Sequence, residues 1–182
     1  MLDQNKEFNN LKIHTQFSIC EGAIKIDELA EYCKKNKIKA LGLTDSFNLC
    51  GALEFAEKIS KAGTQPIIGT QINFLFKDHI GKITLYSKSE LGYKNLTKLS
   101  SLSYLKNKNS IEPFIEIEDL KDNSKDLIIL TGNYNDFFGK LFYANKFKIF
   151  ESILNEFKEI FSNRLYIEIQ RHKESLEKNF EN

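Results

Sequence analysis

The residues of this chain that could do chemistry gather at the ends of its predicted strands. His14 lies on the predicted strand 11–15, Glu21 follows that strand, and Asp45 comes directly after the predicted strand 39–44. Imidazole and carboxylate groups hold divalent ions in hydrolytic sites, where each ion needs several nitrogen or oxygen donors and an open position for water. On residue type alone, His14 could be a metal ligand or a general base, or it could simply be hydrogen-bonded.

The elements that must position these side chains alternate between strand and helix. Short apolar runs predict strands at 11–15, 39–44, 66–76, 82–86, 127–131 and 165–169. Apolar residues at helical spacing predict helices at 27–35, 49–62, 90–105, 115–120, 136–144 and 146–161. A turn is expected at 77–81, followed by an antiparallel or neighbouring strand at 82–86, and a loop is expected at 106–110. This alternation predicts a parallel α/β fold with its polar residues just after the strands, and leaves open whether the sheet closes into a barrel.

Composition excludes several classes of protein. The chain has 182 residues, 41% of them hydrophobic, and its most apolar runs, 66–76 and 127–130, are much shorter than the roughly 20 residues of a membrane helix. All but Arg164 and Arg171 of the 26 basic residues are lysines, and they nearly balance the 25 acidic residues, so a DNA-reading groove is not expected. The start of the chain lacks the apolar stretch of a signal peptide, and the odd number of cysteines has no paired spacing. We therefore expect a cytoplasmic protein that does not enter membranes.

Several conspicuous residues have a simple structural interpretation. A lone histidine such as His14 is more often hydrogen-bonded than catalytic, and His79 could replace a ligand only after a register slip. Cys33, on the apolar side of a predicted helix, is expected to pack as a small hydrophobe. Asp45 and Asn48 are expected to hold the loop after their strand together. The 15 phenylalanines, in a chain without tryptophan, are expected mainly to fill the core, although they could also stack on bases.

Five motifs occur in order along the chain and are more specific than its composition. They are the segments 13–23, 41–55, 65–69, 91–96 and 166–172. Together these segments resemble the N-terminal PHP (polymerase and histidinol phosphatase) domain of bacterial DNA polymerase III alpha subunits. The resemblance implies a distorted (β/α)7 barrel whose strand ends hold up to three metal ions.

The resemblance also indicates where the metal ligands of the family fall in this sequence. The seven positions within the chain are Lys12, His14, Glu21, Ser46, Gln71, Lys82 and Asn133. Only His14 is kept, and Glu21 replaces an expected aspartate. A charged lysine has no lone pair to give to a metal, and the amide of Gln71 is a poor partner for a hard cation. We therefore expect no metal and no cofactor in this chain, with Lys12 and Lys82 replacing the cations as partners of Glu21 or Asp45.

The function implied by the resemblance is that of part of a replicative DNA polymerase. The parent would be a DNA-directed DNA polymerase, a nucleotidyltransferase that uses Mg2+ and deoxynucleoside triphosphates and binds DNA through domains farther along the chain. This domain would be a catalytically inactive scaffold that packs on the polymerase body of the same chain and can dock the proofreading exonuclease subunit. The alternative is an active metal-dependent phosphoesterase, either a 3'-5' exonuclease or a pyrophosphatase. A free-standing relative of histidinol phosphatase fits the motifs around Gly51 and 91–96 less well.

The resemblance also suggests how the length of the chain should be interpreted. The final ligand motif of the family is expected beyond Asn182. Residues 1–182 are therefore interpreted as the N-terminal part of one PHP domain, an incomplete barrel with an open edge where further strands belong.

Overall fold

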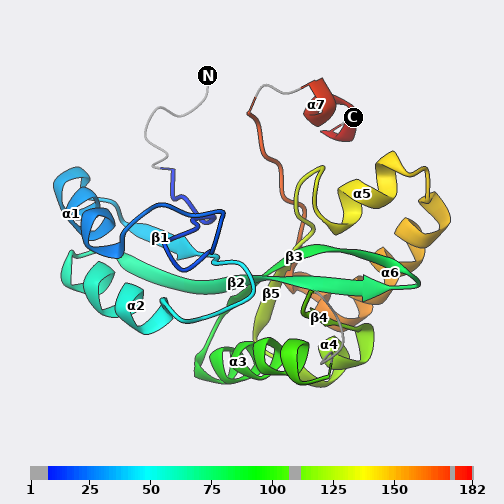
Figure 1. The fold of residues 1–182 in the computed structure, drawn as a ribbon, viewed down its shortest axis with the longest axis horizontal. Helices are drawn as coiled ribbons and strands as arrows, with labels where there is room; N and C mark the ends of the chain where they lie inside the picture. The colour runs from blue at the N-terminus through cyan, green and yellow to red at the C-terminus, as the bar shows by residue number, and fades with distance from the viewer. Residues whose placement is uncertain (1–7, 107–111, 173–174, 182) are drawn as a thin grey trace. The chain divides into compact units, whose positions relative to one another are not determined.

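The computed structural model describes residues 8–106, 112–172 and 175–181. The chain divides into two compact units, residues 1–69 and 70–182, and strand β2 (Gln65–Phe76) contributes its first residues to one unit and its remainder to the other. Each unit is described separately below (Figure 1). Among the described residues, no helix is long and apolar enough to cross a membrane.

The first unit packs two helices on a parallel strand pair. Helix α1 (Ile26–Asn36) and helix α2 (Ala52–Lys61) each bury one apolar face in the core of this unit. Strand β1 (Ala40–Leu43), which lies between the two helices in the sequence, pairs with the start of β2. The buried core joins residues from these helices, from β1 and from the segment before α1. Cys33 lies in this core at 1% exposure, and burial raises the pKa of its thiol, as expected of a cysteine that packs as a hydrophobe.

The strand predicted at 11–15 is reduced to two single bridges in the structure. Ile13 pairs with Leu43, and Thr15 pairs with Ile24, so the segment runs beside β1 without forming a continuous ladder. The close approach depends on Gly42, because a Cβ atom on this residue would lie 2.1 Å from the carbonyl oxygen of Leu11. This contact places the segment that carries His14 directly beside β1.

The second unit is built on a mixed sheet. It contains strands β3 (His79–Ser87), β4 (Phe114–Ile115), β5 (Leu127–Leu130) and β6 (Leu165–Tyr166). Strand β4 pairs parallel with β2 and β6 pairs parallel with β5, but β3 and β5 are antiparallel. The α/β class is confirmed, and the antiparallel pairing of β3 is one of the two arrangements expected for the strand after the turn at 77–81. The turn before β3 is shorter than expected, because Lys77 and Asp78, both with positive φ, make the whole connection.

The helices that were predicted in the second unit agree with the structure within a few residues. They are α3 (Glu90–Leu105), α4 (Ile117–Asn123), α5 (Phe137–Tyr143) and α6 (Phe147–Phe161). The structure adds a 3-10 turn η1 (Ser162–Arg164) after α6 and a helix α7 (Ser175–Glu181). Figure 1 shows α3 and α4 side by side below the strands, with α5 above them. Strand β4 and helix α7 were not predicted, and β6 is shorter than the predicted strand 165–169. The predicted loop 106–110 lies almost wholly outside the described residues.

Phenylalanines fill the core of the second unit. The ring of Phe74 on β2 contacts Phe137 of α5 at 4.9 Å and Phe157 of α6 at 5.2 Å between centroids, both edge to face. All three side chains are essentially without solvent contact. The sequence interpretation of such residues as core is confirmed for Phe74, and for Phe55 in the first unit, but Phe147 is 48% exposed.

Arg164 donates hydrogen bonds to three backbone carbonyl groups of the second unit. Its Nη1 atom donates to the carbonyl oxygens of Ser124 at 2.6 Å and Leu127 at 2.5 Å, and Nη2 donates to Ile160 at 3.3 Å. One guanidinium thus satisfies carbonyl groups at the end of α4, at the start of β5 and near the end of α6. Lysine could not span these acceptors, because it carries one point-like ammonium group.

Candidate functional site

Asp45 is the centre of a buried hydrogen-bond network in the first unit. Its Oδ1 atom accepts from the backbone N–H of Thr15 at 2.6 Å and from the hydroxyl of Ser18 at 2.7 Å, and its Oδ2 atom accepts from the hydroxyl of Thr15 at 2.7 Å. The Asp45 side chain is fully buried. The position directly after β1 makes this geometry possible, because the bridges of Ile13 and Thr15 bring the first segment to that strand end.

The remaining polar residues of this unit lie around the same network. The Ser46 backbone N–H donates to Ser18 Oγ at 3.1 Å, and His14 Nδ1 lies 3.2 Å from that hydroxyl oxygen. The Ser46 hydroxyl donates to Glu21 Oε2 at 2.5 Å, which is 3.7 Å from His14 Nδ1. The structure therefore brings together four of the predicted positions, namely His14, Glu21, Asp45 and Ser46. Lys12, which lies two residues before His14, is half-buried.

The two loops that carry this cluster contain backbone strain. Cys20 and Phe47 both have φ near 65°, a conformation that is uncommon for residues with a side chain, and they flank Glu21 and Ser46. Asn48 fixes the second loop through its side-chain amide, which donates to the carbonyl oxygens of Phe17 and Ser46, each at 2.9 Å. The strained loops thus aim the Ser46 hydroxyl at the Glu21 carboxylate.

The other three predicted positions belong to the second unit. The buried Gln71 side chain on β2 donates to the hydroxyl of Thr84 at 3.2 Å, and Lys82 lies half-buried on β3. Asn133 follows β5, and its side-chain amide donates to Gln170 Oε1 at 2.8 Å. His79 begins β3 and does not lie in the turn, where the sequence had predicted it.

The donor chemistry of these positions does not fit a metal cluster. Two of the seven positions carry ammonium groups, two carry neutral amides and one carries a hydroxyl that donates to a carboxylate. Within the residues that the structure describes, no three or more His, Cys, Asp or Glu side chains are grouped so as to hold a metal ion. The imidazole of His14 and the carboxylate of Glu21 are already engaged with hydroxyl groups, so no hydrolytic step is assigned to a metal here.

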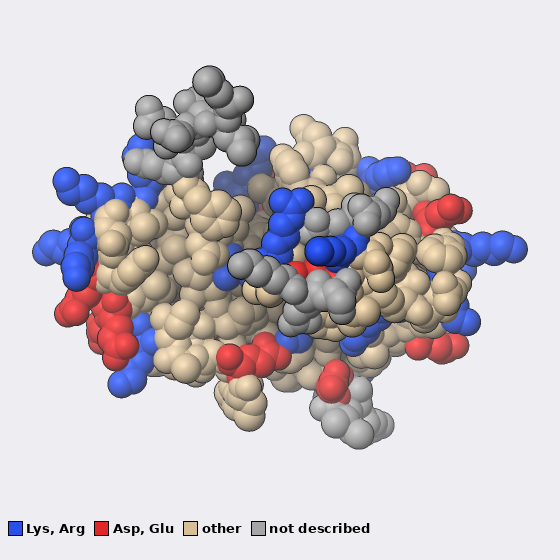
Figure 2. All heavy atoms as spheres, turned by 90° about the horizontal axis from the view of Figure 1, so that it is seen from above, with Lys and Arg blue, Asp and Glu red and all other residues tan. Residues whose placement is uncertain are grey.

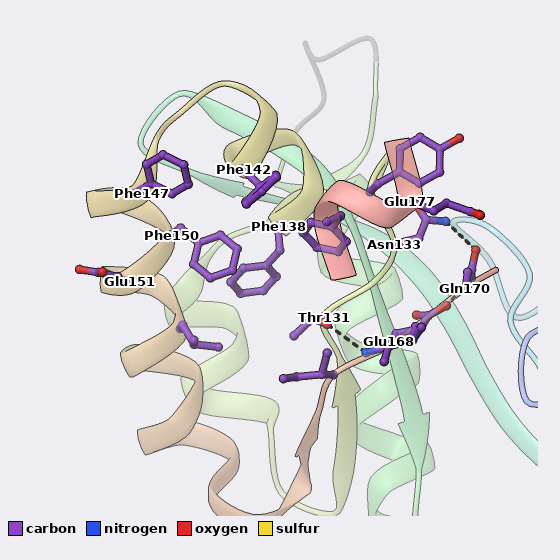
Figure 3. A pocket seen from close by; sticks show the side chains of 15 residues that line it. Thr131, Asn133, Phe138, Phe142, Phe147, Phe150, Glu151, Glu168, Gln170 and Glu177 are labelled. Atoms are coloured by element: carbon purple, nitrogen blue, oxygen red, sulfur yellow. Dashed lines mark hydrogen bonds between the residues drawn. The ribbon is translucent and has the colours of Figure 1, made fainter. Parts of the chain in front are cut away.

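A pocket of about 560 Å³ in the second unit was not predicted from the sequence (Figure 3). Phenylalanines of α5, α6 and α7 line one side, and the segments that follow β5 and β6 line the other. Its lining residues include Asn133, Glu168 and Gln170. Phe142 and Phe147 were interpreted as core residues, and no sequence signal distinguishes an aromatic residue that lines a cavity from one that fills it.

Charge is dispersed outside these sites. On the face drawn in Figure 2, acidic and basic side chains are interspersed with broad uncharged areas, in keeping with the formal net charge of +1.

In the second unit, burial raises the pKa of Tyr86 far above its ordinary value, and the negative charge of Glu168 raises it further. Tyr86 is therefore a neutral phenol at physiological pH.

Comparison with known proteins identifies the family to which this chain belongs. The PHP domain family matches residues 10–172, most of the chain, and the chain therefore belongs to this family. This membership agrees with the predicted α/β fold of PHP type.

Curated relatives narrow the assignment within the family. The chain is 38% identical over 176 residues to DNA polymerase III subunit alpha of Borreliella burgdorferi, covering 91% of this chain and 15% of the relative. It is 38% identical over 167 residues to that subunit of Rickettsia bellii (91% and 14%), and 34% identical over 180 residues to that of Caulobacter vibrioides (93% and 16%). The predicted resemblance to the PHP domain of these subunits is confirmed, and the chain spans only 14 to 16% of the length of these relatives.

Two solved structures also match. One is described as a metal-dependent phosphoesterase from Bifidobacterium adolescentis, with a TM-score of 0.42 and 18% identity over 52% of this chain and 32% of that chain. The other is an amidohydrolase from Chromobacterium violaceum, with a TM-score of 0.44 and 18% identity over 55% of this chain and 34% of that chain.

Proposed function

We propose that this chain is the PHP domain of a replicative DNA polymerase III alpha subunit, and that the domain is a metal-free scaffold. The parent would be a cytoplasmic DNA-directed DNA polymerase whose nucleotidyl transfer, with Mg2+, takes place in another part of the longer chain. The domain would pack on that polymerase body. Family membership and the relatives support the first part of the proposal, and the chemistry of the site supports the second.

One observation carries the scaffold proposal. The Ser46 hydroxyl donates to Glu21 at 2.5 Å, at a position where the family has a histidine that would itself bind metal. A hydroxyl that donates to the remaining carboxylate replaces a metal bridge with a hydrogen bond. The lysines at positions 12 and 82 add positive charge where the family binds cations, which disfavours cation binding further.

Metal analysis and a hydrolysis assay test the scaffold proposal together. The chain is purified without chelators, incubated with Mn2+ or Zn2+, desalted and measured by elemental analysis and with bis(p-nitrophenyl) phosphate. We expect substoichiometric metal and no hydrolysis above that of buffer. A matched variant with Lys12→His, Ser46→His, Gln71→Glu and Lys82→His restores four donors and is expected to retain more metal. Stoichiometric metal in the unmodified chain, with activity lost in His14→Ala, would instead establish the phosphoesterase alternative.

The scaffold would also dock the separate proofreading exonuclease subunit. We expect the purified subunit from the same organism to co-elute with this chain in size-exclusion chromatography. A bound complex with the Glu21→Gln variant as well would place the interface away from the vestigial site. Separate elution of the two proteins at concentrations well above those in the cell would contradict this part of the proposal without affecting the metal result.

A further inference from the structure

The aromatic side of the pocket in the second unit is formed by three helices. Phe138 and Phe142 of α5 contact Phe150 and Phe147 of α6 at 5.1 Å and 5.8 Å between ring centroids. Phe180 of α7 contacts Phe142 at 5.5 Å. Figure 3 shows the labelled α5 and α6 rings grouped on one side of the pocket. Because aromatic faces are electron-rich, this wall can bind an apolar body and attract a cation as well.

The opposite side of the pocket is polar and ordered by hydrogen bonds. The backbone N–H of Glu168 donates to the hydroxyl of Thr131 at 3.1 Å, and the side-chain amide of Gln170 donates to Glu168 Oε1. Asn133 donates to Gln170 in turn, so the three side chains form a chain of contacts. These bonds hold the Glu168 carboxylate in place before any ligand binds, which reduces the entropy that binding would cost.

The charged residues that line the described part of the pocket are all acidic. They are Glu151, Glu168 and Glu177, and neither lysine nor arginine is among the lining residues. Glu177 accepts hydrogen bonds from the backbone N–H and the ring of His172, at 2.7 Å and 2.9 Å. Figure 3 shows the carboxylate of Glu151 turned away from the aromatic rings. The field inside the pocket therefore favours a positive ligand and disfavours a phosphate ester.

We propose that this pocket binds an organic cation with an apolar body, in which an ammonium or guanidinium group faces Glu168 and an aromatic or branched aliphatic group lies among Phe138, Phe142 and Phe147. The volume of about 560 Å³ matches a small-molecule site. A free arylalkylamine has this chemistry, and so does a lysine beside an aromatic residue in a peptide. The site is independent of the proposed scaffold function.

Titration of the 15N-labelled chain tests the proposal by NMR. The probes are 3-phenylpropylamine, the alcohol 3-phenylpropanol and the carboxylate 3-phenylpropanoate, together with the capped dipeptide acetyl-Phe-Lys-amide. We expect amide shifts concentrated at residues 131–150 and 165–170, with affinity falling from amine to alcohol to carboxylate. Comparison of amine and dipeptide identifies which source of the chemistry fits better, and either result supports the site.

Substitutions in the pocket distinguish the contribution of charge to ligand binding from the contribution of shape. Glu168→Gln is expected to weaken amine binding about tenfold, the loss of one charge-assisted contact, and to leave alcohol binding unchanged. Glu159→Gln, on the exposed face of α6 and outside the pocket lining, is the matched control and should change neither, while Phe142→Ala should weaken both. The proposal is overturned if the carboxylate binds as tightly as the amine, if neither amine nor dipeptide shifts these residues, or if Glu168→Gln and Glu159→Gln affect the amine equally.

Discussion

Replacement of Asp45 by alanine is expected to lower the free energy of unfolding of the first unit by about 3–4 kcal/mol, among the larger effects of single substitutions. The carboxylate accepts three hydrogen bonds in a site without solvent contact, so its removal leaves the Thr15 N–H and two hydroxyl groups without their acceptor. Asp45→Asn should lower the free energy of unfolding by only about half as much, because the amide oxygen can still accept the two hydrogen bonds that Oδ1 accepts in the unmodified chain.

Urea unfolding followed by circular dichroism measures this effect, since the chain has no tryptophan for fluorescence. Asp122→Ala, on the exposed face of α4, is the matched control and should change stability by less than about 0.5 kcal/mol. The expected order of stability is unmodified chain, Asp45→Asn, Asp45→Ala. Equal midpoints for Asp45→Ala and the control would mean that the network contributes nothing to stability.

Phe74→Ala is expected to destabilise the second unit by about 3–5 kcal/mol, the range for a large aromatic residue removed from a core. Its ring is fully buried and packs edge to face against Phe137 and Phe157, so the loss combines transfer free energy with a cavity between β2 and two helices. The same urea experiment measures the change.

Phe147→Ala is the control for this substitution. It removes the same number of atoms from the same unit, but the Phe147 ring is 48% exposed, and we expect a loss of about 1 kcal/mol or less. A similar loss for the two variants would show that Phe147 is a core residue and that the pocket is collapsed in solution.

Much of the fold follows from the periodicity of the sequence. Long amphipathic helices such as α3 and α6 were predicted within a residue or two, because an apolar stripe at helical spacing admits few other structures. Short elements were missed or misjudged. Strand β4 has two residues, too few for a pattern, and the strand predicted at 11–15 has suitable alternation but pairs only at isolated bridges.

The candidate site was predicted less completely than the fold. Residue identity was sufficient to mark His14 and Glu21 as polar side chains near a strand end, whereas Ser46 was marked only by the resemblance to the family. Their partnerships were not predictable, because the hydrogen bond from Ser46 to Glu21 joins residues 25 positions apart through two strained loops. The pocket has no local signature at all, since its walls are formed by segments from 131 to 180.

The three hydrogen bonds of Arg164 set a limit on folding during synthesis. The guanidinium emerges from the ribosome 40 residues after Ser124, whose carbonyl group it satisfies. At roughly 5–20 residues per second, that interval is about 2–8 s. Once Leu130 has been made, the nascent chain contains β2, β3 and β5, yet the end of α4 and the start of β5 still lack their donor. The second unit should therefore complete its fold only after translation has passed η1, and a ribosome stalled shortly before residue 164 should hold a protease-sensitive intermediate.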